Sequence, residues 1–250
     1  MAHQILILGG TTESRELAGR LAGRLDLSVT LSLAGRTRSP IAQPVPVRIG
    51  GFGGADGLAQ YLREQQINVL IDATHPFAAR ISANARLAAS QTGVRLLVLR
   101  RPEWAPVPGD RWTLVDSIQD GVSALGVAPR NVFVTLGRQE LGPLEVAPQH
   151  SYVVRSVDPV EPRPAFPSAV YILERGPFDE KRERELLRSL GVDIVLSKNS
   201  GGSAAYAKIA AARALSIPVV MVRRPPGSED SATTVDAALA ALDHLLPPTD

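Results

Sequence analysis

Residues 9–12 combine glycine and hydroxyl side chains in an order that suits anion binding. Gly9, Gly10, Thr11 and Thr12 follow an apolar run at residues 5–8 and precede apolar residues at helical spacing. A strand, a glycine turn and a helix N-terminus in this order present backbone N–H groups to an anion, usually a phosphate. The dinucleotide fingerprint G-x-G-x-x-G is not met, so the stretch also fits the first β–α unit of any α/β protein.

The residues after the second apolar run indicate a phosphorylated dinucleotide. A dinucleotide fold that prefers NAD usually has an acid here to hold the ribose hydroxyls. This chain has Arg36, Thr37, Arg38 and Ser39 instead, and these side chains suit a 2′-phosphate. We therefore expect NADPH as the cofactor, with two solvated surface arginines as the other interpretation.

A third loop, at residues 49–54, places four glycines around Phe52. Such a backbone can approach a flat ligand closely, although a mobile surface loop has the same composition. With a threonine from the next loop, these stretches form the expected cofactor site. Its residues are Gly9, Gly10, Thr11, Thr12, Arg36, Thr37, Arg38, Gly50, Gly51, Phe52, Gly53 and Thr74.

His75 is the candidate catalytic residue and a candidate substrate contact. It lies in the stretch at residues 72–78, where a strand is expected to pass into a helix with Pro76 at the first helical position. A histidine at such a junction can donate a proton or anchor a ligand by a hydrogen bond. A structural histidine with its hydrogen bonds satisfied is the alternative.

The second half contains one loop that is rich in hydrogen-bond donors, at residues 197–203. Lysine, amide, hydroxyl and backbone N–H groups before a helix can bind a carboxylate or a phosphate. The charged run at residues 179–185, by contrast, is interpreted as a solvated helix face without a function. The expected substrate-binding residues of this half are Lys198, Asn199, Ser200, Gly201 and Gly202.

Strands and helices that alternate along the chain must position these loops. Alternation of this kind predicts a parallel sheet covered by helices on both faces. In the first half, strands are expected at residues 4–8, 28–33, 45–49, 68–72 and 95–99, and helices after Thr12, Gly54 and Pro76.

The second half repeats this layout. Residues 68–102 and 193–225 each contain an apolar strand, a loop, an alanine-rich helix and a second strand that ends in Arg-Arg-Pro. We therefore predict an α/β fold of two Rossmann-like parallel-sheet halves, related by internal duplication, with a cleft between them. Residues 1–127 would bind NADP(H) and residues 128–250 the substrate. Whether the strands at 113–115 and 233–235 are exchanged between the halves stays open.

Composition excludes several classes of protein. The 250 residues include no cysteine, and the four histidines lie far apart, so no metal site is expected. The formal net charge of +2 does not indicate a nucleic-acid or membrane partner, and no apolar run is long enough to cross a membrane. A cytoplasmic protein is expected. The Tyr-x-x-x-Lys, phosphate-loop and nucleophile-elbow motifs are absent.

The motifs in their order resemble the precorrin-6A reductase family. The resemblance extends over nearly the whole chain and rests on residues 7–15, on residues 72–78 with Ser82 and Asn84, and on the Lys-Asn-Ser-Gly-Gly run at 198–202. It implies an NADPH-dependent enzyme of cobalamin biosynthesis that reduces a double bond of a tetrapyrrole. Other enzymes of that pathway are further candidate partners.

The resemblance leaves the metal content of the substrate open, because a similar enzyme acts on the cobalt-containing macrocycle. Two other functions fit the residues alone. A two-domain glycosyltransferase would bind its nucleotide in the second half, and a non-catalytic NADP-binding regulator would bind the cofactor without oxidising it.

Overall fold

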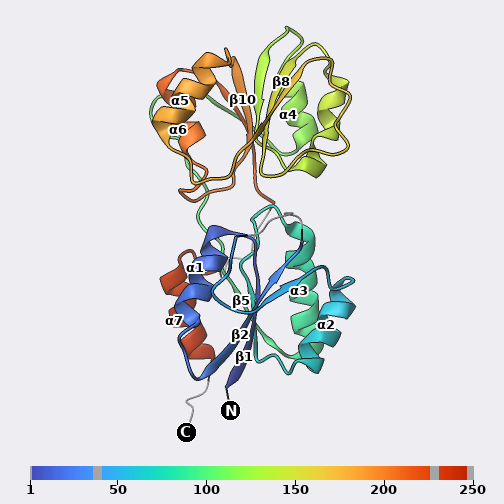
Figure 1. Ribbon diagram of the computed structural model, residues 1–250, viewed down its shortest axis with the longest axis vertical. Coiled ribbons are helices and arrows are strands. Elements are labelled where there is room, and N and C mark those ends of the chain that lie inside the picture. The colour runs from blue at the N-terminus through green and yellow to red at the C-terminus, as the bar shows by residue number, and fades with distance from the viewer. Residues whose placement is uncertain (1, 36–40, 226–230, 247–250) are drawn as a thin grey trace. The chain divides into compact units, whose positions relative to one another are not determined.

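The computed structural model describes residues 2–35, 41–225 and 231–246. Its contacts divide the chain into two compact units (Figure 1). Unit 1 combines Met1–Pro102 with Pro225–Asp250, and unit 2 is the continuous stretch Glu103–Arg224. The residues expected to bind a 2′-phosphate, Arg36, Thr37 and Arg38, lie outside the described residues.

Unit 1 is built on a parallel sheet of five strands. These are β1 (His3–Leu8), β2 (Leu27–Leu33), β3 (Val47–Ile49), β4 (Val69–Asp72) and β5 (Arg95–Val98), and the helices are α1 (Thr12–Leu21), α2 (Ala55–Glu64), α3 (Ala79–Thr92) and α7 (Val235–Leu245). The strand order is β3-β2-β1-β4-β5. Helices α1 and α7 cover one face and α2 and α3 the other (Figure 1). The predicted strands of the first half are confirmed.

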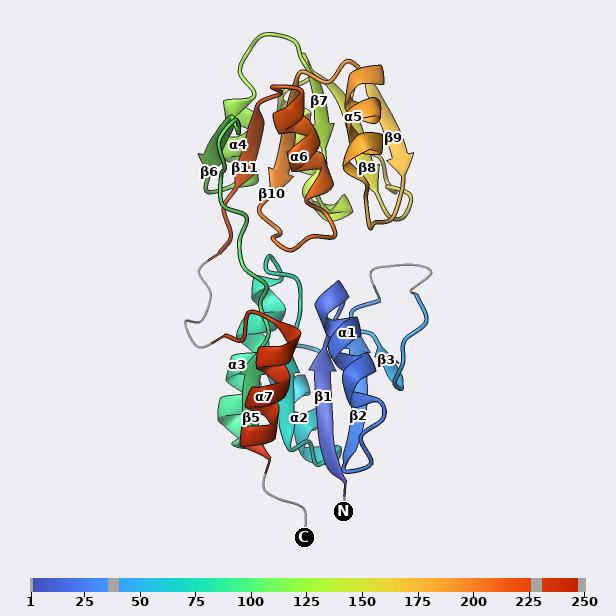
Figure 2. The ribbon, with the colours of Figure 1, turned by 90° about the vertical axis from the view of Figure 1, so that its left-hand side faces the viewer.

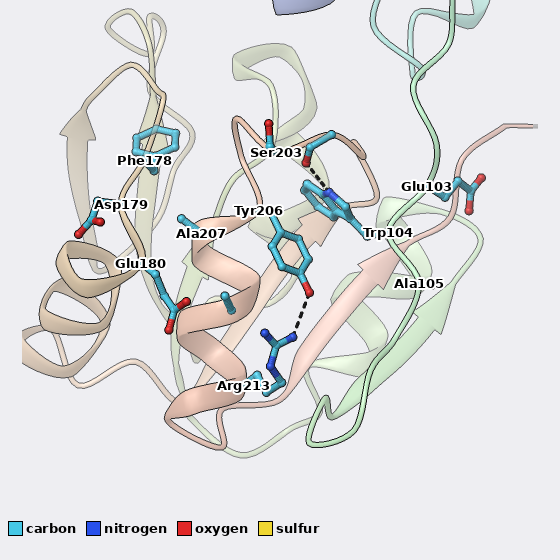
Figure 3. Close-up of a pocket in the computed structure, with 12 residues that line it drawn as sticks. Glu103, Trp104, Ala105, Phe178, Asp179, Glu180, Ser203, Tyr206, Ala207 and Arg213 are labelled. Atoms are coloured by element: carbon cyan, nitrogen blue, oxygen red, sulfur yellow. Dashed lines mark hydrogen bonds between the residues drawn. The ribbon is translucent and has the colours of Figure 1, made fainter. Parts of the chain in front are cut away.

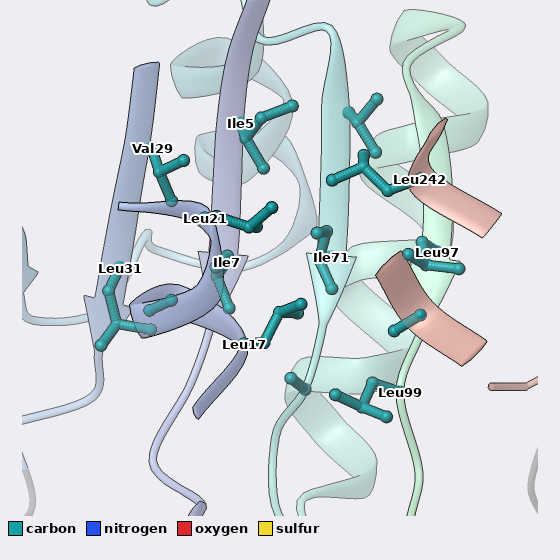
Figure 4. Close-up of a cluster of buried hydrophobic side chains, with 14 of the residues drawn as sticks. Ile5, Ile7, Leu17, Leu21, Val29, Leu31, Ile71, Leu97, Leu99 and Leu242 are labelled. Carbon is teal, nitrogen blue, oxygen red and sulfur yellow. The ribbon is translucent and has the colours of Figure 1, made fainter. Parts of the chain in front are cut away.

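The apolar run of β1 is buried on both faces of this sheet. Ile5 and Ile7 pack into a cluster with α1 and α7, which Figure 4 shows, whereas Leu6 and Leu8 pack against α2 and α3. All four side chains are at most 2% exposed. In a strand that is buried on both faces, apolar and polar residues do not alternate. This is why β1 appears in the sequence as four apolar residues in a row.

Unit 2 has a parallel sheet of six strands (Figure 2). Its strands are β6 (Trp112–Val115), β7 (Asn131–Val134), β8 (Ser151–Ser156), β9 (Ala169–Leu173), β10 (Ile194–Lys198) and β11 (Val219–Val222). Its helices are α4 (Ile118–Ala124), α5 (Glu180–Ser189) and α6 (Ala207–Ala214), with the short 3₁₀ turns η1 (Arg138–Glu140) and η2 (Gly142–Val146). The order is β6-β11-β10-β7-β8-β9.

The two sheets repeat one topology, as the internal duplication predicts. Strands β9-β8-β7-β10-β11 of unit 2 have the same arrangement as β3-β2-β1-β4-β5 of unit 1. In both sheets the chain adds two strands on one side of a central strand, which is β1 or β7, and then crosses to the other side of that strand. Strands β7 and β10 are therefore the counterparts of β1 and β4.

The expected division of the chain at residue 127 is wrong, because a terminal piece of each half completes the other half. Strand β6 lies before residue 127 but pairs with β11, with Val115 opposite Val222, and α4 follows it into unit 2. Ala232 forms a parallel bridge with Leu99 beside β5, and α7 packs on α1 and β5. The exchange that the sequence left open is therefore present.

Helix α3 begins later than expected. Pro76 is not its first residue, because the helix starts at Ala79 and residues 75–78 form a separate turn in which the Ala78 N–H donates to the His75 carbonyl at 2.7 Å. His75 thus lies in a turn ahead of the helix rather than at its first position. Within the described part of the chain, no helix is both long and apolar enough to cross a membrane.

Candidate functional site

In each unit, the candidate residues follow the two neighbouring strands at which the chain changes direction across the sheet. Ligands of open α/β sheets bind beyond the carboxyl ends of strands at this point. In unit 1 these strands are β1 and β4, followed by residues 9–12 and 73–78. A hydrogen bond joins the two loops, because the Thr11 hydroxyl donates to the Ala73 carbonyl at 2.9 Å.

The glycine turn after β1 is shaped by Ser14. The Ser14 Oγ accepts from the N–H groups of Gly10 and Thr11 at 3.1 and 3.0 Å, and Thr11 caps α1 by accepting from the Ser14 N–H at 3.0 Å. This serine stands where the dinucleotide fingerprint has its third glycine. A Cβ at Gly9 would lie 2.5 Å from Leu31 Cδ1 and 3.0 Å from Ser14 Oγ, so a larger residue there would displace these side chains.

Two N–H groups at the start of α1 remain for an anion. Within the described residues, the N–H groups of Thr12 and Glu13 donate no hydrogen bond. The positive end of the helix dipole adds to their attraction for an anion. An anion at the predicted site of residues 9–12 would therefore be bound through the N–H groups of Thr12 and Glu13.

Glu13 is neutralised by an arginine from the end of β5. Arg101 Nη1 lies 2.6 Å from Glu13 Oε2, and the two side chains are 12% and 22% exposed. A lone carboxylate beside a phosphate would repel it, and the ion pair lowers this repulsion. Sequence reasoning missed the pair, although the position of Arg101 just after a strand was a usable signal.

The glycine loop before α2 is organised by Arg48, which the sequence did not single out. Its guanidinium donates to the carbonyls of Gly50 and Gly51 at 2.7 and 2.8 Å and lies 3.8 Å from the centre of the Phe52 ring. The Phe52 ring also meets Tyr61 edge-on at 5.2 Å. Phe52 is thus a packing residue on at least one face of its ring.

The positive φ angles of this loop explain three of its glycines. Gly50, Gly53 and Gly54 have φ angles of +116°, +79° and +101°, which favour glycine. The backbone of the loop, rather than the Phe52 ring, is therefore what it could present to a ligand.

In the loop after β4, Thr74 and His75 have different hydrogen-bond partners. The buried Asp72 accepts from the Thr74 N–H and hydroxyl at 3.1 and 2.6 Å, so the Thr74 hydroxyl donates inward. His75 is half-buried, and its Nδ1 accepts from the Phe77 N–H at 3.3 Å. A neutral imidazole that accepts at Nδ1 carries its proton at Nε2. Nε2 is therefore the atom of His75 that could donate a proton.

In unit 2, the counterpart strands β7 and β10 bring Lys198 against Glu140. Lys198 ends β10, and Glu140 lies in the 3₁₀ turn η1 that follows β7. Lys198 Nζ is 2.5 Å from Glu140 Oε2, and the Gly137 N–H donates to the same oxygen at 2.8 Å. The side chains of Lys198 and Glu140 are 11% and 33% exposed. Sequence reasoning found the lysine but missed its carboxylate partner.

Asn199 contacts the protein itself through its side chain. Its Oδ1 accepts from the Trp104 N–H and its Nδ2 donates to the Trp104 carbonyl, both at 2.9 Å. The Gly202 carbonyl accepts from the Trp104 indole at 2.7 Å. Gly201 and Gly202 both have positive φ, +64° and +70°, which favours glycine at each. Asn199 and Gly202 thus bind Trp104, so any direct contact with a ligand would have to come from other residues of this loop.

A pocket of about 630 Å³ lies in unit 2 next to this loop (Figure 3). Three aromatic residues line it, Trp104, Phe178 and Tyr206. Arg213 donates to the Tyr206 hydroxyl at 2.9 Å, and this hydrogen bond is the main cause that raises the pKa of Arg213 above its ordinary value, with a smaller contribution from Asp110. The guanidinium therefore stays charged and fixed to the wall of the pocket.

The interpretation of residues 179–185 as a solvated face without a function needs correction at Glu183. This residue is 3% exposed and forms a two-pronged ion pair with Arg155 of β8, one contact of which is 2.8 Å long. The guanidinium of Arg155 lies 3.8 Å from the centre of the Phe178 ring and 5.0 Å from that of Phe133. The rest of the run fits a solvated face, because Lys181, Arg182 and Glu185 are exposed and Glu180 lies 4.0 Å from Arg184 at the surface.

The structure thus brings the predicted residues together in two groups, one in each unit. Gly9, Gly10, Thr11 and Thr12 meet the loop of Thr74 and His75 in unit 1, whereas the Lys198 loop is in unit 2. In the described ranges, no group of three or more histidines and acids could hold a metal ion.

Comparison with known proteins gives consistent matches over nearly the whole chain. The family model described as "Precorrin-6x reductase CbiJ/CobK" matches residues 4–243. A precorrin-6A reductase from Sinorhizobium sp. is 58% identical over 98% of this chain and 94% of its own length. The solved structure of a CobK precorrin-6A reductase is 45% identical, with a TM-score of 0.93 and coverage of 97% of both chains.

A relative named for the cobalt-containing substrate is less similar. The cobalt-precorrin-6A reductase of Methanothermobacter thermautotrophicus is 27% identical over 97% of this chain and 83% of its own length. These matches do not favour the glycosyltransferase alternative, because every one of them is to a reductase.

Proposed function

The chain belongs to the precorrin-6x reductase family, and we propose that it uses NADPH to reduce one double bond of precorrin-6A, giving precorrin-6B in cobalamin biosynthesis. The observation that supports this best is the 58% identity, over 98% of the chain, with a relative named precorrin-6A reductase. The metal-free macrocycle is the proposed substrate, because the relative named for the cobalt form is only 27% identical.

Unit 1 is the proposed site of NADPH. The N–H groups of Thr12 and Glu13 would hold the pyrophosphate at the start of α1, and Arg101 neutralises the carboxylate of Glu13 beside it. Arg36 and Arg38 would bind the 2′-phosphate. When bound, NADPH supplies a hydride from C4 of its nicotinamide, and the protein contributes orientation and electrostatics.

His75 is the proposed proton donor to the macrocycle. Its Nδ1 is occupied by the Phe77 N–H, which leaves the Nε2 proton as the one that can be given up. A residue in this role must have a pKa near the working pH, as histidine ordinarily does.

The Lys198 loop of unit 2 is the proposed site of a substrate carboxylate. The ammonium of Lys198 supplies charge, and the backbone of Ser200 and Gly201 continues the loop beside it. Asn199 contributes indirectly, by fixing Trp104 and with it the course of the loop.

The purified chain, mixed with precorrin-6A and NADPH, tests the proposal. We expect the absorbance of reduced nicotinamide to fall as the tetrapyrrole gains two hydrogens in its mass. The same assay with cobalt-precorrin-6A should give much slower oxidation. NADPH binding without oxidation would instead support the non-catalytic regulator, and faster reduction of the cobalt form would reverse the choice of substrate.

The cofactor site has a test of its own. Replacing Arg36 and Arg38 with alanine should weaken NADPH binding about ten- to a hundredfold per residue, because each charge-assisted contact contributes about 1.5–3 kcal/mol. NADH binding, which involves no 2′-phosphate, serves as the control. Equal losses for both cofactors would mean that the arginines do not bind the 2′-phosphate.

A further inference from the structure

The carboxylate of Glu140 lies where the topology of unit 2 would place a ligand. It follows β7, and its partner Lys198 ends the neighbouring β10, so the two residues meet at the point where the sheet changes direction. This is the position at which open α/β sheets bind ligands. The counterpart position in unit 1 contains the uncharged contact between the Thr11 hydroxyl and the Ala73 carbonyl.

The surroundings of the Glu140 carboxylate form a receptor for a carboxylate group. One oxygen, Oε2, accepts from the Lys198 ammonium at 2.5 Å and from the Gly137 N–H at 2.8 Å. Gly137 also leaves the space for it, because a Cβ at this residue would lie 2.7 Å from the same oxygen. An ammonium and a backbone N–H that converge on one oxygen are a strong carboxylate site.

The two partners are not equally fixed. Lys198 is mostly buried and ends a central strand of the sheet, whereas Glu140 is a third exposed and belongs to a 3₁₀ turn of three residues. If the pair separated, the carboxylate would be the group that could move into solvent, while the ammonium would stay at the end of the strand, where a substrate carboxylate could bind to it.

We propose that the carboxylate of Glu140 occupies the position of a substrate carboxylate, and that the substrate carboxylate displaces it on binding. The proposal rests on the proposed function, since the precorrin macrocycle carries the carboxylates that would replace it. Substrate binding is then an exchange, in which Lys198 and the Gly137 N–H change partners without losing a charge-assisted contact. Glu140 lowers the affinity for the substrate and excludes small or weakly charged anions from Lys198.

Glu140→Gln is the decisive variant, because exchange and a purely structural ion pair predict opposite results. The neutral amide competes less for Lys198, so we expect the KM for precorrin-6A to fall about three- to tenfold, with kcat and the KM for NADPH nearly unchanged. A structural pair predicts an unchanged or higher KM. The salt dependence of KM should persist in this variant, because Lys198 still meets the substrate carboxylate.

Three further variants complete the experiment. Glu185→Gln removes the same charge from an exposed position of α5 and should leave KM unchanged, which controls for net charge. Glu140→Asp keeps the charge on a shorter side chain and should return KM toward that of the parent chain. In the background of Lys198→Ala, Glu140→Gln should no longer lower KM, because the shared partner is gone.

The outcomes separate the inference from the proposed function. No oxidation of NADPH by the parent chain with precorrin-6A would refute the proposed function itself. Normal turnover by the parent chain, with an unchanged or raised KM in a folded Glu140→Gln variant, would overturn the exchange alone. Thermal unfolding of each variant shows whether it is folded, and a Glu140→Ala variant replaces Glu140→Gln if the latter is not.

Discussion

The two units repeat one strand order but differ in charge at the point where their sheets change direction. In unit 1, hydroxyls, backbone N–H groups and the buried carboxylate of Asp72 form the edge, and Glu13 at the start of α1 pairs with Arg101. In unit 2, the ion pair of Lys198 with Glu140 occupies the edge itself. The duplicated topology thus gives both units the same candidate position for a ligand, while a few side chains at that position determine which anions it suits.

The difference extends into the interiors of the units. Unit 2 contains the buried pair of Arg155 and Glu183, with the guanidinium stacked against Phe178. Apolar clusters cover both faces of the sheet of unit 1, and unit 2 has an apolar cluster as well, to which Phe133 and Leu187 belong. The additional charges of unit 2 are therefore local, at the candidate substrate loop and beside Phe178, which lines the pocket.

The largest effect is expected from breaking the buried pair of unit 2. Glu183→Gln should lower the free energy of unfolding by up to about 3–5 kcal/mol, because the buried guanidinium of Arg155 loses its two-pronged partner and keeps the half-exposed carboxylate of Glu174 at 3.5 Å. Denaturant unfolding followed by circular dichroism measures the loss. Glu180→Gln, at the exposed pair on the same helix, should change stability by less than about 1 kcal/mol. Equal effects of the two variants would contradict the importance of burial.

The next effect concerns unit 1, whose contribution should appear in the rate. His75→Asn should lower kcat about a hundredfold or more and leave the affinity for NADPH close to that of the parent chain. Steady-state kinetics with precorrin-6A, together with a cofactor titration, separates the two quantities. A folded variant with normal kcat would assign His75 to the structural role.

Unit 2 should contribute to substrate binding instead. Lys198→Ala should raise the KM for precorrin-6A about ten- to a hundredfold and weaken its dependence on salt, because a charge-assisted contact is lost. NADPH affinity should barely change. Lost NADPH affinity with unchanged tetrapyrrole binding would mean that the roles of the two units are reversed.

The smallest effect is a loss of stability in acid, which should come from unit 2. Burial lowers the pKa of His150 below its ordinary value of 6.5, and among the described residues its Nδ1 has no hydrogen-bond partner. As the pH falls below about 6.5, the unfolded chain takes up a proton before the folded chain does, so the free energy of unfolding decreases. His150→Gln should reduce this decrease between pH 7 and pH 5, as denaturant unfolding at each pH measures, and an unchanged decrease would show that another group causes it.

The strands of both units could be predicted because their signal is local. A parallel strand that is covered on both faces is a short apolar run, and every run identified in the first half forms a strand. The N-cap at Thr11 is also a local feature, since a capping side chain and its N–H partner lie three residues apart. Residues 36–40, where the expected 2′-phosphate site lies, are not among those described.

The side-chain pairs of the site could not be predicted because they join distant parts of the chain. Arg101 and Glu13 are 88 residues apart, Lys198 and Glu140 are 58 apart, and Trp104 and Asn199 are 95 apart. In the sequence, each of these residues is indistinguishable from a solvated charged or amide side chain, because its partner is distant along the chain. The sequence therefore identified the loops of the site, while their internal hydrogen bonds, which decide what each loop has left for a ligand, came from the structure.

The repeat also showed that residues 113–116 and 233–236 correspond, but not which sheet each would join. In the structure, β6 pairs with β11 of unit 2, and Ala232 pairs with Leu99 beside β5 of unit 1. Strands β11 and β5 are counterparts, so each segment could have joined either sheet. Hydrophobic pattern is the same for both choices, so it carries no information about the exchange.

This exchange makes unit 2 an insertion within unit 1, with consequences for how the chain matures as it is synthesised. Unit 2 is continuous and has all of its residues once Arg224 has been made. Unit 1 must wait for α7, because Val235, Ala238 and Leu242 belong to the same buried cluster as Ile5 and Ile7. A nascent chain or a truncated product that ends before residue 235 therefore exposes the apolar face of its first sheet. A product that ends within unit 2 would therefore lack part of the buried cluster of the proposed cofactor unit.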